Sequence, residues 1–296
     1  MAEKTRIVLQ TATPGGGFPA YGDPYAAILN EMDPTLAIET RNSKGSNENI
    51  FALDAGTADL GLVTGEVTYE ALHGLGRPKT TGFRIINATY SQAGMFMVRA
   101  DSPHRNIADL AGKTVVWGAA SSGFIVLARY VMDGLGYDYK QSFGAVLLEK
   151  AGDGPPQVID GSAAAMWGGG VGWPPFMAIA SNPKGGRFVA PSADEIARIQ
   201  AKHAFLKRTT MPAGSYPGQA GAIDSVGSWP FVLARASLPD DVAYRLARAL
   251  HRAEAVFPSR LEQARETTLA NTLAAAPSRD LIHPGVLRYM REIGLM

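Results

Sequence analysis

The sequence contains no cysteine. This absence excludes disulfides, thiol catalysis and zinc sites built from cysteine, and it is compatible with an oxidising compartment. No segment approaches the ~18 consecutive apolar residues of a membrane-spanning helix. The first residues, MAEKTRIVLQ, lack the apolar stretch of an export signal. Because Met1 and Ala2 precede charged residues, the start looks like that of a trimmed mature chain, with a plain cytoplasmic protein as the alternative.

The chain also has little net charge: 28 Lys and Arg face 27 Asp and Glu, which gives +1. This balance gives no electrostatic case for a nucleic-acid partner or an anionic membrane. The sequence has no HExxH, no Asp-rich calcium loop and no phosphate loop of the GxxxxGK[ST] type, and no GxGxxG stands between a strand and a helix. We therefore expect no metal site and no cofactor.

Glycine and proline are abundant, at 33 and 19 of 296 residues, and they punctuate alternating strand and helix patterns. The stretch RIVLQTA at 6–12 has a strand pattern, and the helical pattern PYAAILNEM follows a glycine loop. The order strand, small-residue loop, helix recurs near 115–135. Alternating strands and helices predict an α/β fold with mostly parallel sheets, and the length suits about two domains.

Three loops rich in glycine and hydroxyl residues each precede a predicted helix: 13–21, 43–49 and 118–124. In parallel sheets such loops meet at the carboxyl ends of the strands. Unpaired N–H groups at helix N-termini favour a carboxylate or a phosphate there. Ser46 and Asn49 are therefore candidate ligand contacts, while the alternative is that Ser46 only caps its own helix.

Other residues have two readings as well. Ser122 stands where a hydrolase nucleophile would, but GAASSGF does not match GxSxG. Trp173 and Tyr216 lie beside glycine or proline, and Tyr90 lies at the end of a predicted strand, in the segment leading to Gly94. All three could line a pocket, although most large aromatic residues belong to cores. Glu66 and Lys44 are more often solvated charges than ligand partners.

Five motifs in order make the chain resemble the TAXI family, the extracytoplasmic solute-binding proteins of TRAP transporters. They are TATPGGGF, GSNENIFALDAGTADLGLVTGE, IADLAGKTVVWGAASSGF, MPAGSYPGQ and IHPGVLRYMREIGL. Each motif alone is loose, whereas the five at family-like spacing are specific.

The resemblance implies a two-lobed type II periplasmic-binding-protein fold with a ligand cleft between the lobes. One lobe would hold residues 1–97 and 225–296, and the other 98–224. The protein would then be periplasmic, with its signal peptide absent from this chain. It would bind a small organic anion, commonly a carboxylate, deliver it to a TRAP-type membrane permease, and have no enzymatic activity.

The resemblance also implies ligand-binding residues at the matching positions. The positions that match the family motifs are Thr13, Gly15, Gly16, Phe18, Ser43, Gly45, Ser46, Asn49, Glu66, Ser121, Ser122, Gly123 and Phe124. Five further residues are candidates because they are aromatic residues that could line a pocket or because they lie in the AAAMWGGGVGW and MPAGSYPGQ segments: Tyr90, Gly169, Gly170, Trp173 and Tyr216. Phe18 and Phe124 stand where many members carry Tyr and Thr. The glycines at 168–170 stand where bulkier residues are usual. Both departures favour a larger or more apolar ligand than glutamate.

Two other functions remain open at this point. A ligand-sensing module of the same fold would explain the missing export signal. A hydrolase using Ser122 as its nucleophile is the enzymatic alternative.

Overall fold

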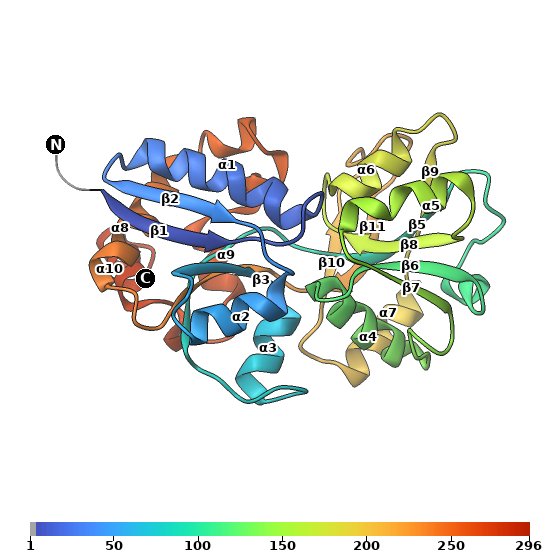
Figure 1. Ribbon diagram of the computed structural model, residues 1–296, viewed down its shortest axis with the longest axis horizontal. Helices are drawn as coiled ribbons and strands as arrows, with labels where there is room; N and C mark the ends of the chain where they lie inside the picture. Colours follow the sequence, from blue (N-terminus) through green and yellow to red (C-terminus); the bar gives the residue numbers. More distant parts are fainter. Residues whose placement is uncertain (1–3) are drawn as a thin grey trace. The chain divides into compact units, whose positions relative to one another are not determined.

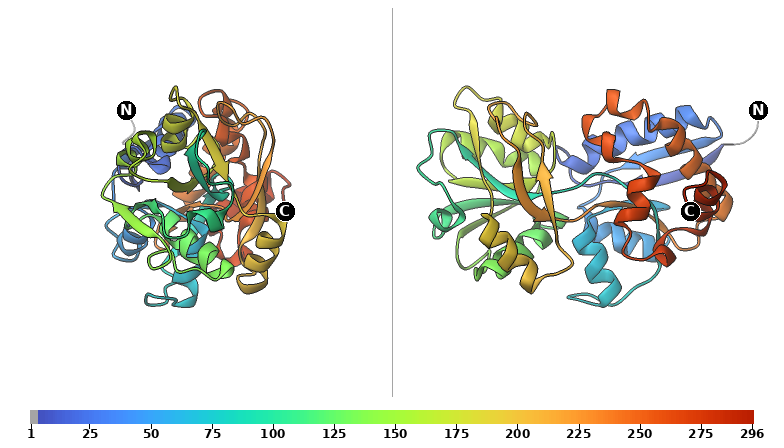
Figure 2. Two further views of the ribbon diagram at one scale, coloured as in Figure 1. Left: turned by 90° about the vertical axis from the view of Figure 1, so that its right-hand side faces the viewer. Right: turned by 180° about the vertical axis from the view of Figure 1, so that it is seen from behind.

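The computed structural model describes residues 4–296 (Figures 1 and 2). Residue contacts divide the chain into two compact units, each treated separately below. Unit 1 holds the described residues up to Ala12, Phe18–Tyr90 and Trp229–Met296, and unit 2 holds Thr13–Gly17 and Ser91–Ser228. In Figure 1 the elements of unit 1 are blue and red, and most of those of unit 2 are green and yellow, so the two ends of the chain share one unit.

Unit 1 is built on a five-stranded sheet in the order β2-β1-β3-β12-β4. Its strands are β1 (Thr5–Gln10), β2 (Leu36–Arg41), β3 (Leu60–Val63), β4 (Phe83–Ala88) and β12 (Phe231–Arg235). Its α-helices are α1 (Gly17–Met32, whose first residue groups with unit 2), α2 (Ser46–Asp54), α3 (Gly65–His73), α8 (Asp240–Ala253), α9 (Leu269–Ala275) and α10 (Pro284–Glu292). Short 3₁₀ turns lie at η3 (Phe257–Ser259), η4 (Glu262–Glu266) and η5 (Arg279–Leu281).

Unit 2 has a second five-stranded sheet, in the order β7-β6-β8-β5-β9, and a two-stranded sheet of β10 and β11. Its strands are β5 (Gly94–Arg99), β6 (Thr114–Ala119), β7 (Gly144–Leu148), β8 (Ala165–Gly169), β9 (Gly186–Val189), β10 (Lys207–Met211) and β11 (Ile223–Gly227). Its helices are α4 (Gly123–Leu135), α5 (Pro155–Asp160), α6 (Pro174–Ala180) and α7 (Ala193–Lys202), with 3₁₀ turns η1 (Ile107–Leu110) and η2 (Ala151–Asp153).

The expected α/β class is confirmed, and both large sheets are mixed rather than purely parallel. In unit 1, β12 pairs antiparallel with both β3 and β4, while β1, β2 and β3 pair in parallel. In unit 2, β5 pairs antiparallel with β8 and β9, while β6, β7 and β8 pair in parallel. Each antiparallel strand is the first strand after the chain crosses into that unit, so it enters the sheet from the opposite end.

The chain passes from unit 1 into unit 2 after residue 90 and returns after residue 228. The family resemblance implies lobe boundaries after residues 97 and 224. The difference arises because β5 and β11 belong to unit 2. Phe96 and Met97 of β5 pair with Val189 and Phe188 of β9. The apolar run at 94–99 cannot show from the sequence which sheet it joins, because both sheets need a buried strand.

Helix ends largely follow their capping residues. Ser192 and Glu195 form a capping box at the start of α7, and Gly136, with φ 86°, ends α4 in the left-handed conformation. Helix α8 carries Asp240 and Asp241 in its first turn and Arg252 in its last, as the helix dipole favours. None of the helices within residues 4–296 combines the length and hydropathy that crossing a bilayer needs.

Two helices differ from the sequence expectations. Helix α1 begins at Gly17, so Pro24 lies inside it rather than near its start. No helical pattern marks residues 65–73 in the sequence, yet they form α3, which ends at Gly74 with φ 71°. Its nine residues are too few for a strong periodic signal.

Candidate functional site

In unit 1 the loop at 43–49 lies at the carboxyl ends of the parallel strands. Ser43 follows β2, and its hydroxyl donates to the Thr11 carbonyl (3.1 Å) and accepts from the Gly45 N–H (3.0 Å). Gly45 is the N-cap of α2 with φ 119°, a conformation that favours glycine. The hypothesis that Ser46 caps α2 is therefore wrong, because Ser46 is the first residue inside the helix and Gly45 makes no side-chain cap.

Ser46 and Asn49 connect α2 to the sheet. The Ser46 hydroxyl accepts a hydrogen bond from the Thr64 N–H at 3.1 Å, at the end of β3. The Asn49 amide donates to the carbonyls of Thr11 (2.8 Å) and Leu62 (2.7 Å). Both side chains are buried. The structure thus brings Ser43, Ser46 and Asn49 together, and it gives each of them a role inside unit 1.

Three further polar residues lie at this edge of the sheet and were not among the ligand contacts predicted from the sequence: Gln10, Thr11 and Thr64. They are buried, and each stands at or just beyond the end of a strand. Within residues 4–296, the side-chain oxygens of Gln10, Thr64 and Asn49 include buried atoms without a hydrogen-bond partner. Buried acceptors of this kind call for a donor, such as an ordered water. A polar residue directly after a buried strand is the sequence signal that could have identified them.

The other predicted residues of unit 1 are buried as well. Glu66 lies in the first turn of α3 with no exposed surface, where the helix dipole favours a carboxylate. Phe18 lies in the first turn of α1 instead of in the expected loop. Tyr90 is buried with its ring 5.3 Å from that of Tyr21. Both helices carry a carboxylate in the first turn: Glu66 in α3 is fully buried, whereas Glu48 in α2 is half-buried and accepts from the Lys44 N–H at 2.9 Å.

The first glycine loop is divided between the units. Thr13–Gly17 groups with unit 2, although β1 and nearly all of α1, which flank it, belong to unit 1. Thr13 accepts a hydrogen bond from the Gly16 N–H at 3.2 Å, and Gly15 has φ 78°, so the segment is a tight turn that requires glycine.

In unit 2, Ser121 and Ser122 lie between the carboxyl end of β6 and α4, and Gly123 and Phe124 begin that helix. The Ser122 hydroxyl accepts from the Phe124 N–H at 3.2 Å and caps α4. Among residues 4–296, no histidine shares a hydrogen bond with Ser122, so a hydrolase triad is not assembled there. Gly123 and Phe124 are buried in the first turn of the helix.

Aromatic side chains pack beneath this turn. The Phe124 ring lies 5.3 Å from that of Trp173, and the Phe124 carbonyl accepts from the Trp167 indole N–H at 2.9 Å. The Tyr216 hydroxyl donates to the Gly170 carbonyl (2.6 Å) and accepts from the Trp173 N–H (2.7 Å). Tyr216 and Trp173 thus fix the turn after β8.

Gly168 and Gly169 do not leave extra room for a ligand, contrary to the expectation from the sequence. A Cβ on Gly168 would lie 2.1 Å from Cζ3 of Trp173, and one on Gly169 would lie 2.0 Å from the Ala93 carbonyl oxygen. The space left by the missing side chains is therefore filled by an indole ring and by the neighbouring strand. Gly170 has φ 88°, which suits the turn.

No group of three or more potential metal ligands from His, Asp and Glu occurs within residues 4–296. The arrangement in each unit is instead a helix N-terminus, preceded by glycine and serine, at the carboxyl end of a strand: α2 in unit 1 and α4 in unit 2. Such turns can bind an anion through backbone N–H groups.

Several solved structures share the fold. A putative sulfonate ABC transporter periplasmic sulfonate-binding protein from Methylobacillus flagellatus KT superposes with a TM-score of 0.57 at 10% identity, over 100% of this chain and 96% of that one. A TctC solute binding protein from Polaromonas gives 0.54 at 15% identity, over 98% of both chains. An ancestral arginine-binding protein gives 0.54 at 12% identity, over 89% of this chain and 99% of that one.

At these identities the likeness establishes the fold, which is that of two-lobed periplasmic binding proteins. The sequence itself gives the closer relationship, since a family model matches residues 9–294, nearly the whole chain. The chain belongs to the NMT1-like family.

Proposed function

We propose that this protein is the solute-binding component of a periplasmic transport system. The observation that carries the proposal is the recurrence, in each unit, of a glycine–serine turn that leads from the end of a buried strand into a helix N-terminus. Family membership and the shared fold agree with it, because the similar structures include proteins named for binding a sulfonate and arginine.

The proposed ligand is a small organic anion with a carboxylate. In unit 1 the candidate anion-binding helix end is the first turn of α2, where Glu48 accepts from the Lys44 N–H, rather than that of α3, where the Glu66 carboxylate is fully buried. In unit 2 the candidate anion-binding helix end is the start of α4, with the hydroxyls of Ser121 and Ser122. Each helix end would contribute about 0.3–1 kcal/mol, and up to ~2 kcal/mol where the site is dry. Charge would thus be recognised without an arginine.

The body of the ligand would be apolar or aromatic. Phe18 and Phe124 each lie in the first turn of a helix that follows a glycine-rich turn. Neither offers a hydroxyl. The glycines at 168–170 no longer support this size argument, so it depends on the two phenylalanines.

The proposed membrane partner is a TRAP-type permease of the TAXI class, as the five sequence motifs suggest. A permease of this type is driven by an ion gradient. Uptake by proteoliposomes that contain a TRAP-type permease, with the purified protein outside, should therefore require an ion gradient and no ATP. Uptake that requires ATP hydrolysis would contradict the proposed TRAP-type permease but not the proposed solute-binding function.

Native mass spectrometry of the purified protein tests the binding function first, by detecting a carried-over anion. A thermal-shift panel then ranks aromatic, branched and dicarboxylic acids, because saturating ligand raises stability by RT ln(1 + [L]/Kd). The matched variants are Ser121→Ala, in the proposed contact turn, and Ser181→Ala, an exposed serine of unit 2 outside it. Only Ser121→Ala should weaken binding. A panel in which no organic anion shifts the melting temperature contradicts the proposal.

A further inference from the structure

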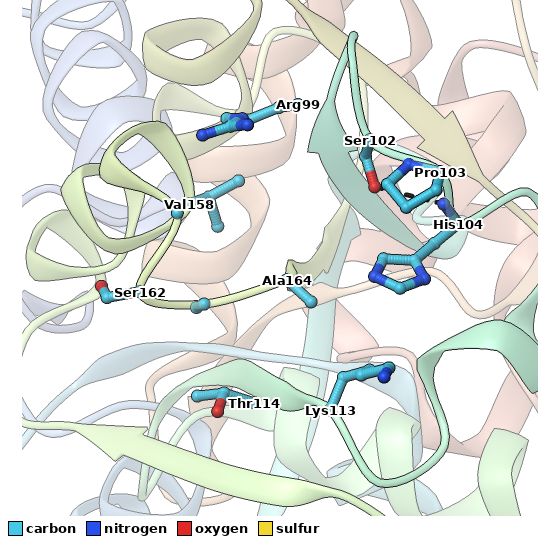
Figure 3. Close-up of a pocket in the computed structure, with 11 residues that line it drawn as sticks. Arg99, Ser102, Pro103, His104, Lys113, Thr114, Val158, Ser162 and Ala164 are labelled. Atoms are coloured by element: carbon cyan, nitrogen blue, oxygen red, sulfur yellow. Dashed lines mark hydrogen bonds between the residues drawn. The ribbon is translucent and has the colours of Figure 1, made fainter.

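A cavity of about 280 Å³ opens in unit 2 at the edge of the sheet where β6 and β8 begin. It is lined by the end of β5 and the loop after it, by the start of β6, and by the turn between α5 and β8 (Figure 3). The candidate turn Ser121–Phe124 follows the opposite end of β6, about 17 Å away at ~3.3 Å per residue. None of the predicted site residues lines this cavity.

The lining is basic. Arg99, His104 and Lys113 contribute side chains, Ser102, Thr114 and Ser162 contribute hydroxyl groups, and no lining residue is Asp or Glu. Figure 3 shows the three basic side chains on different sides of the opening. Val158, Ala163 and Ala164 supply small apolar surface between them.

The carboxylates near the cavity are already engaged. Asp101 accepts from Nε (2.8 Å) and Nη2 (3.1 Å) of Arg99. Asp109 accepts from the backbone N–H groups of Arg105 (2.6 Å) and Asn106 (3.2 Å). Asp160 accepts from the Ser162 N–H at 2.8 Å. None of these carboxylates is bonded to Lys113 or His104.

A further guanidinium supports the loop that carries His104. Arg187 donates to the carbonyls of Ser102 (3.1 Å) and His104 (2.6 Å). Burial and the neighbouring charge of Arg105 lower the pKa of Arg187. Positive charge is thus concentrated behind the loop as well as in the lining.

From this cavity we infer a second binding site, for a small tetrahedral oxyanion of the phosphate type. Asp101 occupies the Nε–Nη2 edge of Arg99, so only the Nη1 end of this guanidinium is left to donate to an anion. A tetrahedral oxyanion accepts single bonds from several directions, and the Lys113 ammonium and the hydroxyls of Ser102 and Thr114 can supply them, while the Ser162 hydroxyl donates to the Gln157 carbonyl. The volume suits a phosphate with a small substituent. This site is independent of the proposed transport function.

Titration with inorganic phosphate, followed by amide shifts in ¹H–¹⁵N spectra, tests the inference. Sodium chloride of equal ionic strength is the reference, because salt alone screens surface charge. We expect saturable shifts confined to residues 99–105, 113–114 and 158–164. Lys113→Gln should weaken phosphate binding about tenfold or more. Lys140→Gln, an exposed lysine beside Tyr139 outside the cavity, changes the same charge and should bind as the parent protein does.

Thr114→Glu places a carboxylate at the exposed start of β6 and should abolish the shifts while the rest of the spectrum stays folded. Vesicles of phosphatidylglycerol distinguish a free oxyanion from a lipid headgroup, and no Lys113-dependent sedimentation is expected. The inference is overturned if chloride reproduces the phosphate shifts, if Lys113→Gln binds phosphate normally, or if only vesicles bind.

Discussion

At the scale of single residues, Asn49 shows how a predicted contact can also be a structural tie. Its amide bridges the ends of β1 and β3 from a position inside α2, with no exposed surface. Asn49→Ala should lower the free energy of unfolding by about 1–3 kcal/mol, because it removes two buried hydrogen bonds, one to the Thr11 carbonyl and one to the Leu62 carbonyl. Urea denaturation measures the loss. Lys44→Ala, an exposed neighbour, is the control and should change little.

Asn49→Asp separates hydrogen bonding from size, since the carboxylate keeps the shape and donates nothing. It should destabilise at least as much as alanine does. If both variants unfold like the parent but lose ligand binding, Asn49 acts on the ligand rather than on the sheet.

Gly168 and Gly221 form a matched pair for the packing argument. Gly168→Ala would press a methyl group into the Trp173 ring and should lower the free energy of unfolding by about 1–3 kcal/mol. A Cβ on Gly221 meets no atom within 4 Å and its φ is not positive, so Gly221→Ala should be neutral or slightly stabilising. Equal stabilities for the two variants would contradict the close packing of Trp173.

The position of a residue within a helix or loop was easier to predict than the contacts of its side chain. Glycine and serine next to a predicted helix start correctly indicated that Gly45, Ser46 and Ser122 lie at helix N-termini. The sequence could not show that the Ser46 hydroxyl is bonded to Thr64, because that bond joins positions brought together only by the sheet. The absence of bulk at Gly168 was likewise misread, since the filling ring comes from a different segment.

At the scale of elements, α10 is held by a buried histidine. His283 is the N-cap of α10; its Nδ1 accepts from the Gly285 N–H at 3.2 Å, and its Nε2 lies 3.0 Å from the Leu238 carbonyl. These partners select the neutral form with the proton on Nε2. Burial lowers the pKa of His283, although the Leu238 carbonyl and the charge of Asp240 act in the opposite direction.

The sign of the pH effect follows from that lowered pKa. Below the ordinary histidine pKa of about 6.5, the unfolded chain binds the proton more readily than the folded protein does. The free energy of unfolding should therefore fall as the pH drops from about 7 towards 5. Burial raises the pKa of Glu254, which acts in the opposite sense over part of this range.

Comparison with His283→Gln isolates the contribution of His283. The variant should be less stable at pH 7.5, and its stability should fall less on acidification, as urea denaturation at several pH values would show. His73→Gln changes an exposed histidine at the end of α3 and should keep the pH slope of the parent protein. A parental slope in His283→Gln would exclude His283 as its source.

Helices and strands could be predicted where a local residue pattern marks them, but the direction in which a strand joins its sheet could not. The strands β1, β2 and β3 and the helices α4, α7 and α8 follow their apolar periodicity and caps. The antiparallel placement of β5 and β12 depends on the order in which the chain enters each unit, and no local signal encodes that order.

At the scale of the whole molecule, the chain is one continuous unit inserted into another. Unit 2 consists of the continuous segment Ser91–Ser228 and of the short segment Thr13–Gly17. Unit 1 is made of residues from both ends of the chain. A single apolar cluster that includes Phe96, Trp117, Trp167 and Phe176 extends from Ala93 to Val226 and lies entirely inside unit 2. The ends of the inserted segment meet, because the Gln92 N–H donates to the Ser228 carbonyl at 3.2 Å.

This organisation predicts that residues 91–228 fold alone. The fragment should show dispersed amide resonances and a cooperative urea transition, because it contains the whole apolar cluster of unit 2 and all of that unit's strands, from β5 to β11. Joining residue 90 to residue 229 by a short glycine linker should give the complementary unit, because the Thr89 N–H already donates to the Pro230 carbonyl at 2.9 Å. The control is residues 1–90 alone, which lack β12 between β3 and β4 and should not fold cooperatively. A disordered 91–228 fragment would mean that the core of unit 2 depends on contacts outside that segment, and the inserted-unit description would fail.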